Sequence, residues 1–244
     1  MIGDLLPVRV KTVEALGDAP TSSMFPVEAA VVARAVDKRR REFTTVRVCA
    51  RQALGRLGIA PTPILPGMHG APRWPAGIVG SMTHCTGYRA AAVARSADLA
   101  TIGVDAEPNS PLPNVRILKK VTHAEERDQI ARLNAHRSDI CWDRLFFSAK
   151  ESVFKAWHPL TGRVLDFLAA TVTVHPESGT FTAALLAPGP FVDGIQLSAF
   201  TGGWRVREGI IVTAIAVPRK GIGPAGPGRR PGRRPSGGPG ATAA

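Results

Sequence analysis

The sequence predicts a mixed α/β protein, because segments with the period of a helix alternate with segments typical of strands. Two long segments, 38–57 and 139–157, place apolar residues three and four positions apart, as amphipathic helices do. Short β-branched segments bounded by turn residues, such as 102–108 and 210–217, are expected to be strands. A chain of 244 residues suits one large domain or two closely packed halves.

The other expected elements complete this pattern. The first 25 residues are weakly patterned and are expected to cover the surface of the core. A helix is expected over 26–36, because Pro26 and Glu28 suit its first turn. Another is expected over 122–133, with Thr122 and Glu125 as a capping box. The remaining strands are expected at 77–85, 88–95, 170–174, 179–186, 195–200 and 204–207.

Composition and charge narrow the class of protein. The formal net charge is +12, of which six positive charges lie in 219–244, leaving +6 on residues 1–218. A basic surface suggests an acidic partner: phosphate groups, nucleic acid or an acidic protein. The segment 219–244 is rich in Gly, Pro and Arg, and we expect it to be disordered.

Cysteine usage and hydropathy predict the compartment. The three cysteines are far apart and fit neither a disulfide framework nor a zinc site. No apolar run reaches the length of a membrane span, and the N-terminus has no secretory pattern. We therefore expect a cytoplasmic protein that does not enter a membrane.

The segment 102–108, Ile-Gly-Val-Asp-Ala-Glu-Pro, carries the first candidate for chemistry. Residues two apart in a strand point to the same face, so Asp105 and Glu107 should project together. Two neighbouring carboxylates repel each other unless a cation lies between them, and Mg²⁺ with phosphate as a further ligand is a common occupant. From this segment alone, a strand followed by a polar turn with both acids solvated is the favoured interpretation.

Two helices carry further candidates. Glu151 and Lys155 are four apart on the 139–157 helix, which suits either a catalytic pair or an ordinary surface ion pair. On the 38–57 helix, arginines including Arg39 and Arg47 form either a solvated face or a clamp for an anion. His84 follows small hydroxyl residues, a setting in which backbone N–H groups can face a ligand.

Three motifs occur in a fixed order: Gly-Ser-Met-Thr-His at 80–84, Gly-Val-Asp-Ala-Glu-Pro at 103–108, and Phe-Ser-Ala-Lys-Glu-Ser-Val-Phe-Lys-Ala-Trp at 147–157. Together they resemble the Sfp-type 4′-phosphopantetheinyl transferases, in the branch of enterobactin synthetase component D. The resemblance covers about 26–217. It implies transfer of the phosphopantetheine arm of coenzyme A to a serine of an acyl or peptidyl carrier protein, with release of adenosine 3′,5′-bisphosphate.

The resemblance also implies an architecture. The family fold has two similar halves related by a pseudo-twofold axis, each a small sheet with a helix packed on it, and acts as a monomer. We place the boundary near residue 100, which gives subdomains 1–100 and 101–218 and a tail at 219–244.

The resemblance assigns roles to individual residues. Asp105 and Glu107 would hold Mg²⁺, with Mn²⁺ as the other possible metal, and Glu151 would complete the metal site or act as general base. Lys155 would neutralise charge on the departing phosphate. The residues expected to bind coenzyme A are Arg39, Arg47, Ser81, Met82, Thr83 and His84. Lys150, on a different face of the helix from Glu151, would either contact a phosphate or be structural.

One departure from the family pattern stands in the loop at 63–67. Related sequences often have Lys where this chain has Pro66, and Arg73 could supply the missing phosphate contact. The alternative functions are a metal-dependent phosphodiesterase or nuclease and a basic nucleic-acid-binding protein, although we expect no specific nucleic-acid partner.

Overall fold

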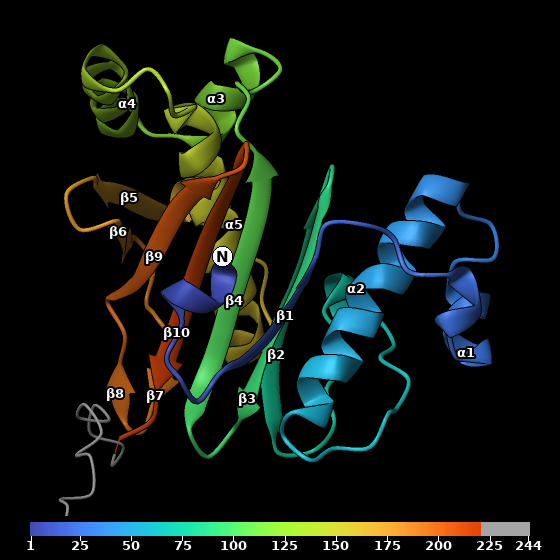
Figure 1. Cartoon of the computed structure of the whole chain (residues 1–244). Helices are drawn as coiled ribbons and strands as arrows, with labels where there is room; N and C mark the ends of the chain where they lie inside the picture. Colours follow the sequence, from blue (N-terminus) through green and yellow to red (C-terminus); the bar gives the residue numbers. More distant parts are fainter. Residues whose placement is uncertain (221–244) are drawn as a thin grey trace, which may run out of the picture.

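A computed structural model describes residues 1–220. The main elements fall on two sides of the molecule, with α1 and α2 on one side and α3, α4 and α5 on the other (Figure 1). The elements in chain order are β1 (Lys11–Ala15), α1 (Pro26–Val31), α2 (Asp37–Gly55), β2 (Ile78–Cys85), β3 (Tyr88–Arg95), β4 (Leu99–Pro108), α3 (Val115–Val121), α4 (Ala124–His136), α5 (Trp142–Thr161), β5 (Ala170–His175), β6 (Thr180–Leu185), β7 (Phe191–Val192), β8 (Ile195–Gln196), β9 (Ala199–Arg207) and β10 (Ile210–Pro218).

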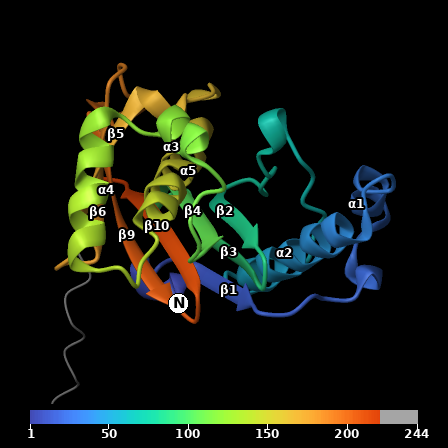
Figure 2. The ribbon, with the colours of Figure 1, turned by 90° about the horizontal axis from the view of Figure 1, so that it is seen from above.

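The first half of the chain forms a three-stranded antiparallel sheet in the order β1-β3-β2, with α2 packed on it (Figure 2). The buried side of α2 carries Cys49, Ala50, Ala53 and Leu54, at the helical spacing that the sequence suggested. The small side chains of Cys49, Ala50 and Ala53 let the helix lie close to the alanine-rich strand β3. The same helix contributes Arg39 and Arg47 to the cavity described below.

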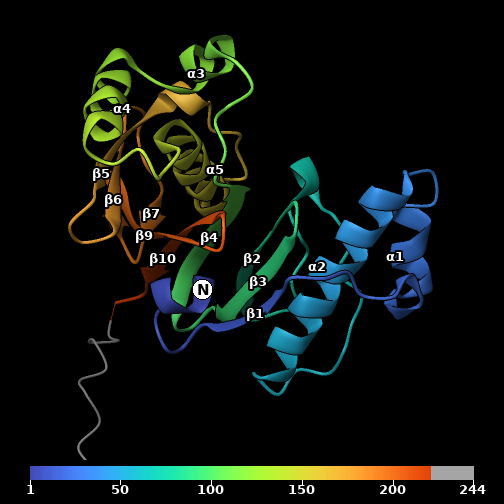
Figure 3. The same ribbon diagram turned by 45° about the horizontal axis from the view of Figure 1, so that its top comes forward.

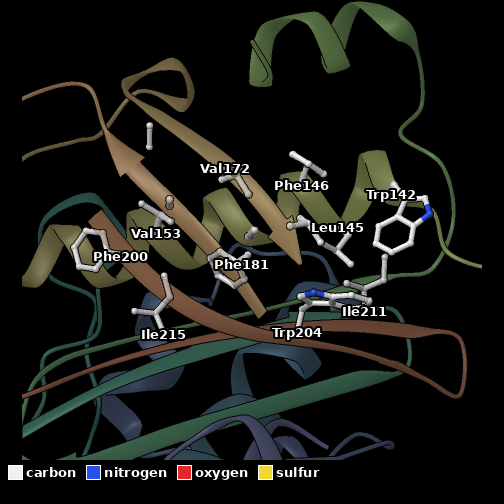
Figure 4. Packing of buried hydrophobic residues seen from close by; sticks show 14 of the residues in the cluster. Trp142, Leu145, Phe146, Val153, Val172, Phe181, Phe200, Trp204, Ile211 and Ile215 are labelled. Atoms are coloured by element: carbon white, nitrogen blue, oxygen red, sulfur yellow. The ribbon is translucent and has the colours of Figure 1, made fainter. Parts of the chain in front are cut away.

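The second half forms a five-stranded antiparallel sheet in the order β4-β10-β9-β6-β5, covered by α5. Figure 4 shows the apolar side chains of α5 facing those of the sheet, with Trp142 packed edge to face against Trp204 at 5.4 Å between ring centres. Burial of these aromatic and aliphatic side chains is the main source of stability for this half. It also fixes the position of α5 over the sheet.

The two sheets meet along β2 and β4, which pair only through side chains. The Ser81 hydroxyl accepts a hydrogen bond from the backbone N–H of Val104 at 3.1 Å, and the Thr83 hydroxyl accepts one from Ala106 at 3.0 Å. Hydroxyls two residues apart on one strand thus satisfy alternate N–H groups of the other, where a backbone ladder would otherwise be needed. Figure 3 shows the two sheets side by side at this junction.

The predicted mixed α/β class is confirmed: a three-stranded sheet with α2 forms the first half, and a five-stranded sheet with α5, together with the two-stranded β7–β8 sheet, forms the second. The helices expected at 38–57 and 139–157 and the strands expected at 77–85, 88–95 and 102–108 are all present. None of the helices within residues 1–220 is long and apolar enough to cross a membrane.

Several expectations were wrong in detail. The first 25 residues contain strand β1, α1 ends at Val31, and α3 was not predicted. The cap of α4 is one residue later than expected, because the backbone N–H of His123 donates to Glu126 at 2.6 Å. The strands expected at 195–200 and 204–207 are instead the short β8 and the long β9.

The tail expectation falls mostly outside the described residues. Arg219 and Lys220, its first two residues, are ordered. The Arg219 guanidinium donates to the Ser96 carbonyl at 2.8 Å and to Asp193 at 2.6 Å. Disorder of the remaining segment, 221–244, stays a prediction.

Candidate active site

A polar stripe on α5 faces β4 and organises the site. Arg144, Ser148, Glu151 and Lys155 are spaced four, three and four residues apart, so they lie on one side of the helix. The helix can approach β4 closely because Gly103 has no side chain. A Cβ there would overlap the carbonyl oxygen of Ser152 on α5 and lie 2.8 Å from the Ala156 nitrogen.

Asp105 is the centre of the hydrogen bonds between strand and helix. It is only 4% exposed, and its carboxylate accepts from the Lys155 ammonium at 2.7 Å and from the Ser148 hydroxyl at 2.8 Å. Thr83, on β2, donates to the same carboxylate at 3.2 Å. Lys155 therefore pairs with Asp105 in place of the local Glu151–Lys155 ion pair that the helical spacing allowed.

Glu107 lies two residues along β4 and is held by Arg144, whose guanidinium donates to it at 3.0 Å. Burial and, after it, the negative charge of Asp105 raise the pKa of Glu107 to about 7, against the opposing effects of Arg144 and Lys155. Burial likewise raises the pKa of Glu151, with Lys155 opposing and Asp105 adding to the rise. The negative charge of Asp105 thus raises the pKa of both glutamates.

The chemistry of these acids fits a hard cation. Three carboxylates supply oxygen ligands, and mutual repulsion makes a positive charge among them favourable. As the side chains stand, no three metal-binding residues within 1–220 are close enough together to surround an ion. Binding would therefore require the side chains to turn away from their present partners Lys155 and Arg144.

A cavity of about 910 Å³ adjoins the acids at Lys155. Its walls come from α2, β2, the start of β4, the end of α5 and the loop at 66–74. Among the lining residues there is no carboxylate. The titratable residues that line it are Arg39, Arg47, His69, Arg73, His84, Lys155 and His158.

The positive charges of Arg39 and Arg47 lie near the His84 ring at one side of this cavity. The Arg39 guanidinium donates to the His84 ring at 2.8 Å, and Glu42 lies 3.4 Å from the same ring. Burial lowers the pKa of His84, and the charges of Arg39 and Lys155 lower it further while Glu42 raises it. Burial also lowers the pKa of Arg47 to about 10, with nearby Arg39 contributing. A bound anion would relieve this crowding.

Arg47 uses part of its hydrogen-bonding capacity within the protein. Its guanidinium donates to the Ile64 carbonyl at 2.8 Å and to the Phe43 carbonyl at 3.3 Å, so it holds the loop after α2 as well as lining the cavity. Ser81 and Met82 line the cavity too, as the sequence led us to expect. Pro66 and Arg73 both line it, and the backbone N–H of Arg73 donates to the Leu65 carbonyl at 2.9 Å.

Two expected contacts with coenzyme A need correction. The Lys150 ammonium is buried and donates to Glu126 at 2.9 Å and to the carbonyls of Phe167 and Ala170 at 2.8 and 2.9 Å, which uses all three of its protons. Thr83 does not line the cavity, because its hydroxyl is used between Ala106 and Asp105. Both residues support the structure around the site.

Sequence reasoning missed Arg144 and Ser148 as parts of the site. A signal for both was present, because continuing the spacing of Glu151 and Lys155 toward the helix N-terminus leads to positions 148 and 144. That polar stripe was overlooked beside the stronger apolar one.

Comparison with known proteins identifies the family. The family model of the 4′-phosphopantetheinyl transferase N-terminal domain matches residues 27–94, and that of the 4′-phosphopantetheinyl transferase superfamily matches residues 101–204. The 4′-phosphopantetheinyl transferase Svp of Streptomyces mobaraensis is 60% identical over 220 residues, 89% of each chain. The chain belongs to the 4′-phosphopantetheinyl transferase superfamily.

Further relatives support this membership. The 4′-phosphopantetheinyl transferase PptT of Mycobacterium tuberculosis is 41% identical over 89% of this chain and 98% of its own length. The enterobactin synthase component D of Salmonella typhi is 32% identical over 49% of each chain. Enzymes of this superfamily transfer the 4′-phosphopantetheine of coenzyme A to carrier proteins, and this chain is an enzyme of that class. The superfamily membership decides against a nuclease or a nucleic-acid-binding protein.

Proposed function

We propose that this transferase works with Mg²⁺, or Mn²⁺ in its place, and modifies a serine of an acyl or peptidyl carrier protein. One observation carries the proposal. The cavity is lined only by cationic, imidazole and uncharged side chains, and Lys155 in its wall bonds to Asp105 and also lowers the pKa of Glu107 and Glu151. A polyanion such as coenzyme A suits the cavity. Its pyrophosphate, placed at the junction, would lie between Lys155 and the acids.

The residues on the cavity side bind and orient the nucleotide. Arg39 and His84 already form a hydrogen-bonded pair, and a phosphate oxygen can replace the His84 ring nitrogen as the acceptor of the Arg39 guanidinium. We assign the 3′-phosphate to this pair together with Arg47. Ser81 and Met82 form the neighbouring wall, where the nucleoside would lie.

The acids are assigned to metal binding and proton transfer. Asp105 and Glu107 are the proposed metal ligands, and Glu151 is the third oxygen donor of the group. A bound Mg²⁺ would supply positive charge to the pyrophosphate of the substrate. Because burial raises the pKa of Glu151, its carboxylate is also suited to accept the proton of the attacking serine. Lys155 balances the charge that develops on the leaving phosphate.

The charge of the protein supports the class of partner. The +6 carried by residues 1–218 complements carrier proteins, which are generally acidic. We expect the enzyme to act as a monomer, as the resemblance to the family implies. Cys49, Cys85 and Cys141 are free thiols, which supports a cytoplasmic location.

The test is the mass of an apo carrier protein after incubation with this enzyme, coenzyme A and Mg²⁺. We expect a gain of one phosphopantetheine that EDTA abolishes. Asp105→Asn should abolish it as well, whereas Asp139→Asn, which alters an exposed carboxylate paired only with Arg137, should not. Modification that persists without divalent metal, or in Asp105→Asn, would contradict the proposed site.

The two roles of Glu151 can be separated by a second measurement. If Glu151 is a metal ligand, Glu151→Gln weakens Mg²⁺ binding measured by calorimetry in the presence of coenzyme A. If it acts only as the base, Mg²⁺ affinity is retained while kcat falls by about 10²–10⁴-fold.

A further inference from the structure

The polar stripe of α5 has one more member that no motif includes. After Arg144, Ser148, Glu151 and Lys155, the next position at the same spacing is His158. The first two and Lys155 donate hydrogen bonds to the acids of β4. His158 lies one turn beyond Lys155 and lines the nucleotide cavity.

His158 is buried without a polar partner. It is 9% exposed, and its Nε2 is shielded from water with no hydrogen-bond partner within the described chain. Its neighbours are two rings: Phe154 at 5.8 Å between centres, and His69, in an edge-on contact at 5.5 Å. A buried ring nitrogen without a hydrogen-bond partner is unfavourable, so a polar group of a ligand placed next to Nε2 would be stabilising.

His69 belongs to the loop at 66–72 and is itself exposed. Its backbone has a φ of 52°, a conformation that non-glycine residues rarely adopt. The loop is closed at its base by a bridge between Pro66 and Pro72. The contact between His69 and His158 therefore joins the loop to α5 across the cavity.

We propose that His158 is a specificity residue for the nucleotide, and that its imidazole hydrogen-bonds the adenosine part of coenzyme A once His69 moves aside. This inference rests on the proposed function. Flat rings around one hydrogen-bonding nitrogen match a purine nucleoside better than a phosphate. The phosphates have partners elsewhere, at Lys155 and at the pair Arg39–His84.

The experiment is calorimetry of the full chain with adenosine 3′,5′-bisphosphate. His158→Phe keeps the ring and removes its nitrogens, and we expect about fivefold to tenfold weaker binding, as for one lost hydrogen bond. His158→Gln, which restores a polar group near the position of Nε2, should recover most of the affinity. The matched control is His136→Phe. His136 is an exposed residue of α4 that does not line the cavity, so this variant should bind like the wild type.

Two further readouts fix the contact. In the transfer reaction, His158→Phe should raise the KM for coenzyme A and leave kcat unchanged. The loss should be equally large with dephospho-coenzyme A, which lacks the 3′-phosphate. A loss that disappears with this analogue would place the contact at the phosphate and overturn the inference.

The second variant is His69→Ala, on an exposed loop residue that can be changed without disturbing the core. We expect tighter nucleotide binding, because a contact that must break is already gone. Weaker binding would refute the movement of His69. Affinity of His158→Phe within twofold of the wild type would refute the role of His158 while leaving the proposed function intact. A wild-type chain that neither binds the bisphosphate nor modifies a carrier would refute both.

Discussion

The close approach of α5 to β4 depends on Gly103, and Gly103→Ala tests it. The added Cβ would overlap the Ser152 carbonyl oxygen and lie 2.8 Å from the Ala156 nitrogen. Both are backbone atoms, so no side-chain rotation can relieve the overlap and the helix must move away. Overpacking of a core costs about 1–3 kcal/mol, and a backbone clash belongs at the upper end of that range.

A loss of about 3 kcal/mol should lower the melting temperature of a chain of this size by about 6–12 °C. The rate of carrier modification should also fall at temperatures where the variant is fully folded. The reason is that moving the helix lengthens the 2.7 Å contact from Lys155 to Asp105 and the 2.8 Å contact from Ser148 to Asp105. Melting followed by circular dichroism measures the first effect, and carrier modification well below the melting temperature measures the second.

The matched control is Gly17→Ala, since a Cβ at Gly17 meets nothing within 4 Å. This variant should keep both the melting temperature and the activity of the wild type. A Gly103→Ala protein that melts and reacts like the wild type would show that β4 and α5 are not held as closely as described, and the explanation for glycine in the Gly-Val-Asp motif would fail.

Three further predictions concern charged pairs. Arg144→Gln removes a charge that lowers the pKa of Glu107, so the acidic limb of the pH–rate profile should move to higher pH; an unchanged limb would contradict this. Because the folded-state pKa of Glu107 is raised from 4.5 to about 7, the metal-free protein should lose stability as pH rises through that window, and Glu107→Gln should flatten the loss seen in melting curves at pH 5 and 8. Lys150→Met leaves the Glu126 carboxylate buried without its cation and should cost about 3–5 kcal/mol of unfolding free energy. Nucleotide affinity, measured by calorimetry, should be unchanged, and a weaker affinity would show that Lys150 contacts the nucleotide.

The parts of the site that could be predicted from the sequence are those with a local pattern. Alternation along 102–108 predicts a strand with two carboxylates, and Asp105 and Glu107 both lie in β4. Helical spacing likewise predicts the long helix of Glu151 and Lys155. Both patterns depend on the period of a single element, which a sequence shows directly.

The errors arose where a partner is distant in the chain. Lys150 belongs to a motif, yet its partner Glu126 lies 24 residues away on α4, and nothing local shows that the two meet. Thr83 was expected to contact a ligand, whereas it bonds to β4, 22 residues further along the chain. Only the packing of one element on another determines such pairs.

The same reasoning explains why Asp105, more than either glutamate, should control the site. Its carboxylate accepts from Thr83 on the first sheet and from Ser148 and Lys155 on the helix of the second half. The two sheets share no backbone ladder at β2 and β4, so these side-chain bonds help to fix one half relative to the other. The cavity takes its walls from both halves, and its shape therefore depends on the junction at which Asp105 lies. Loss of that carboxylate should disturb nucleotide binding and metal binding together, whereas loss of Glu107, whose side-chain hydrogen bond within residues 1–220 is with Arg144 of the second half, should affect the metal alone.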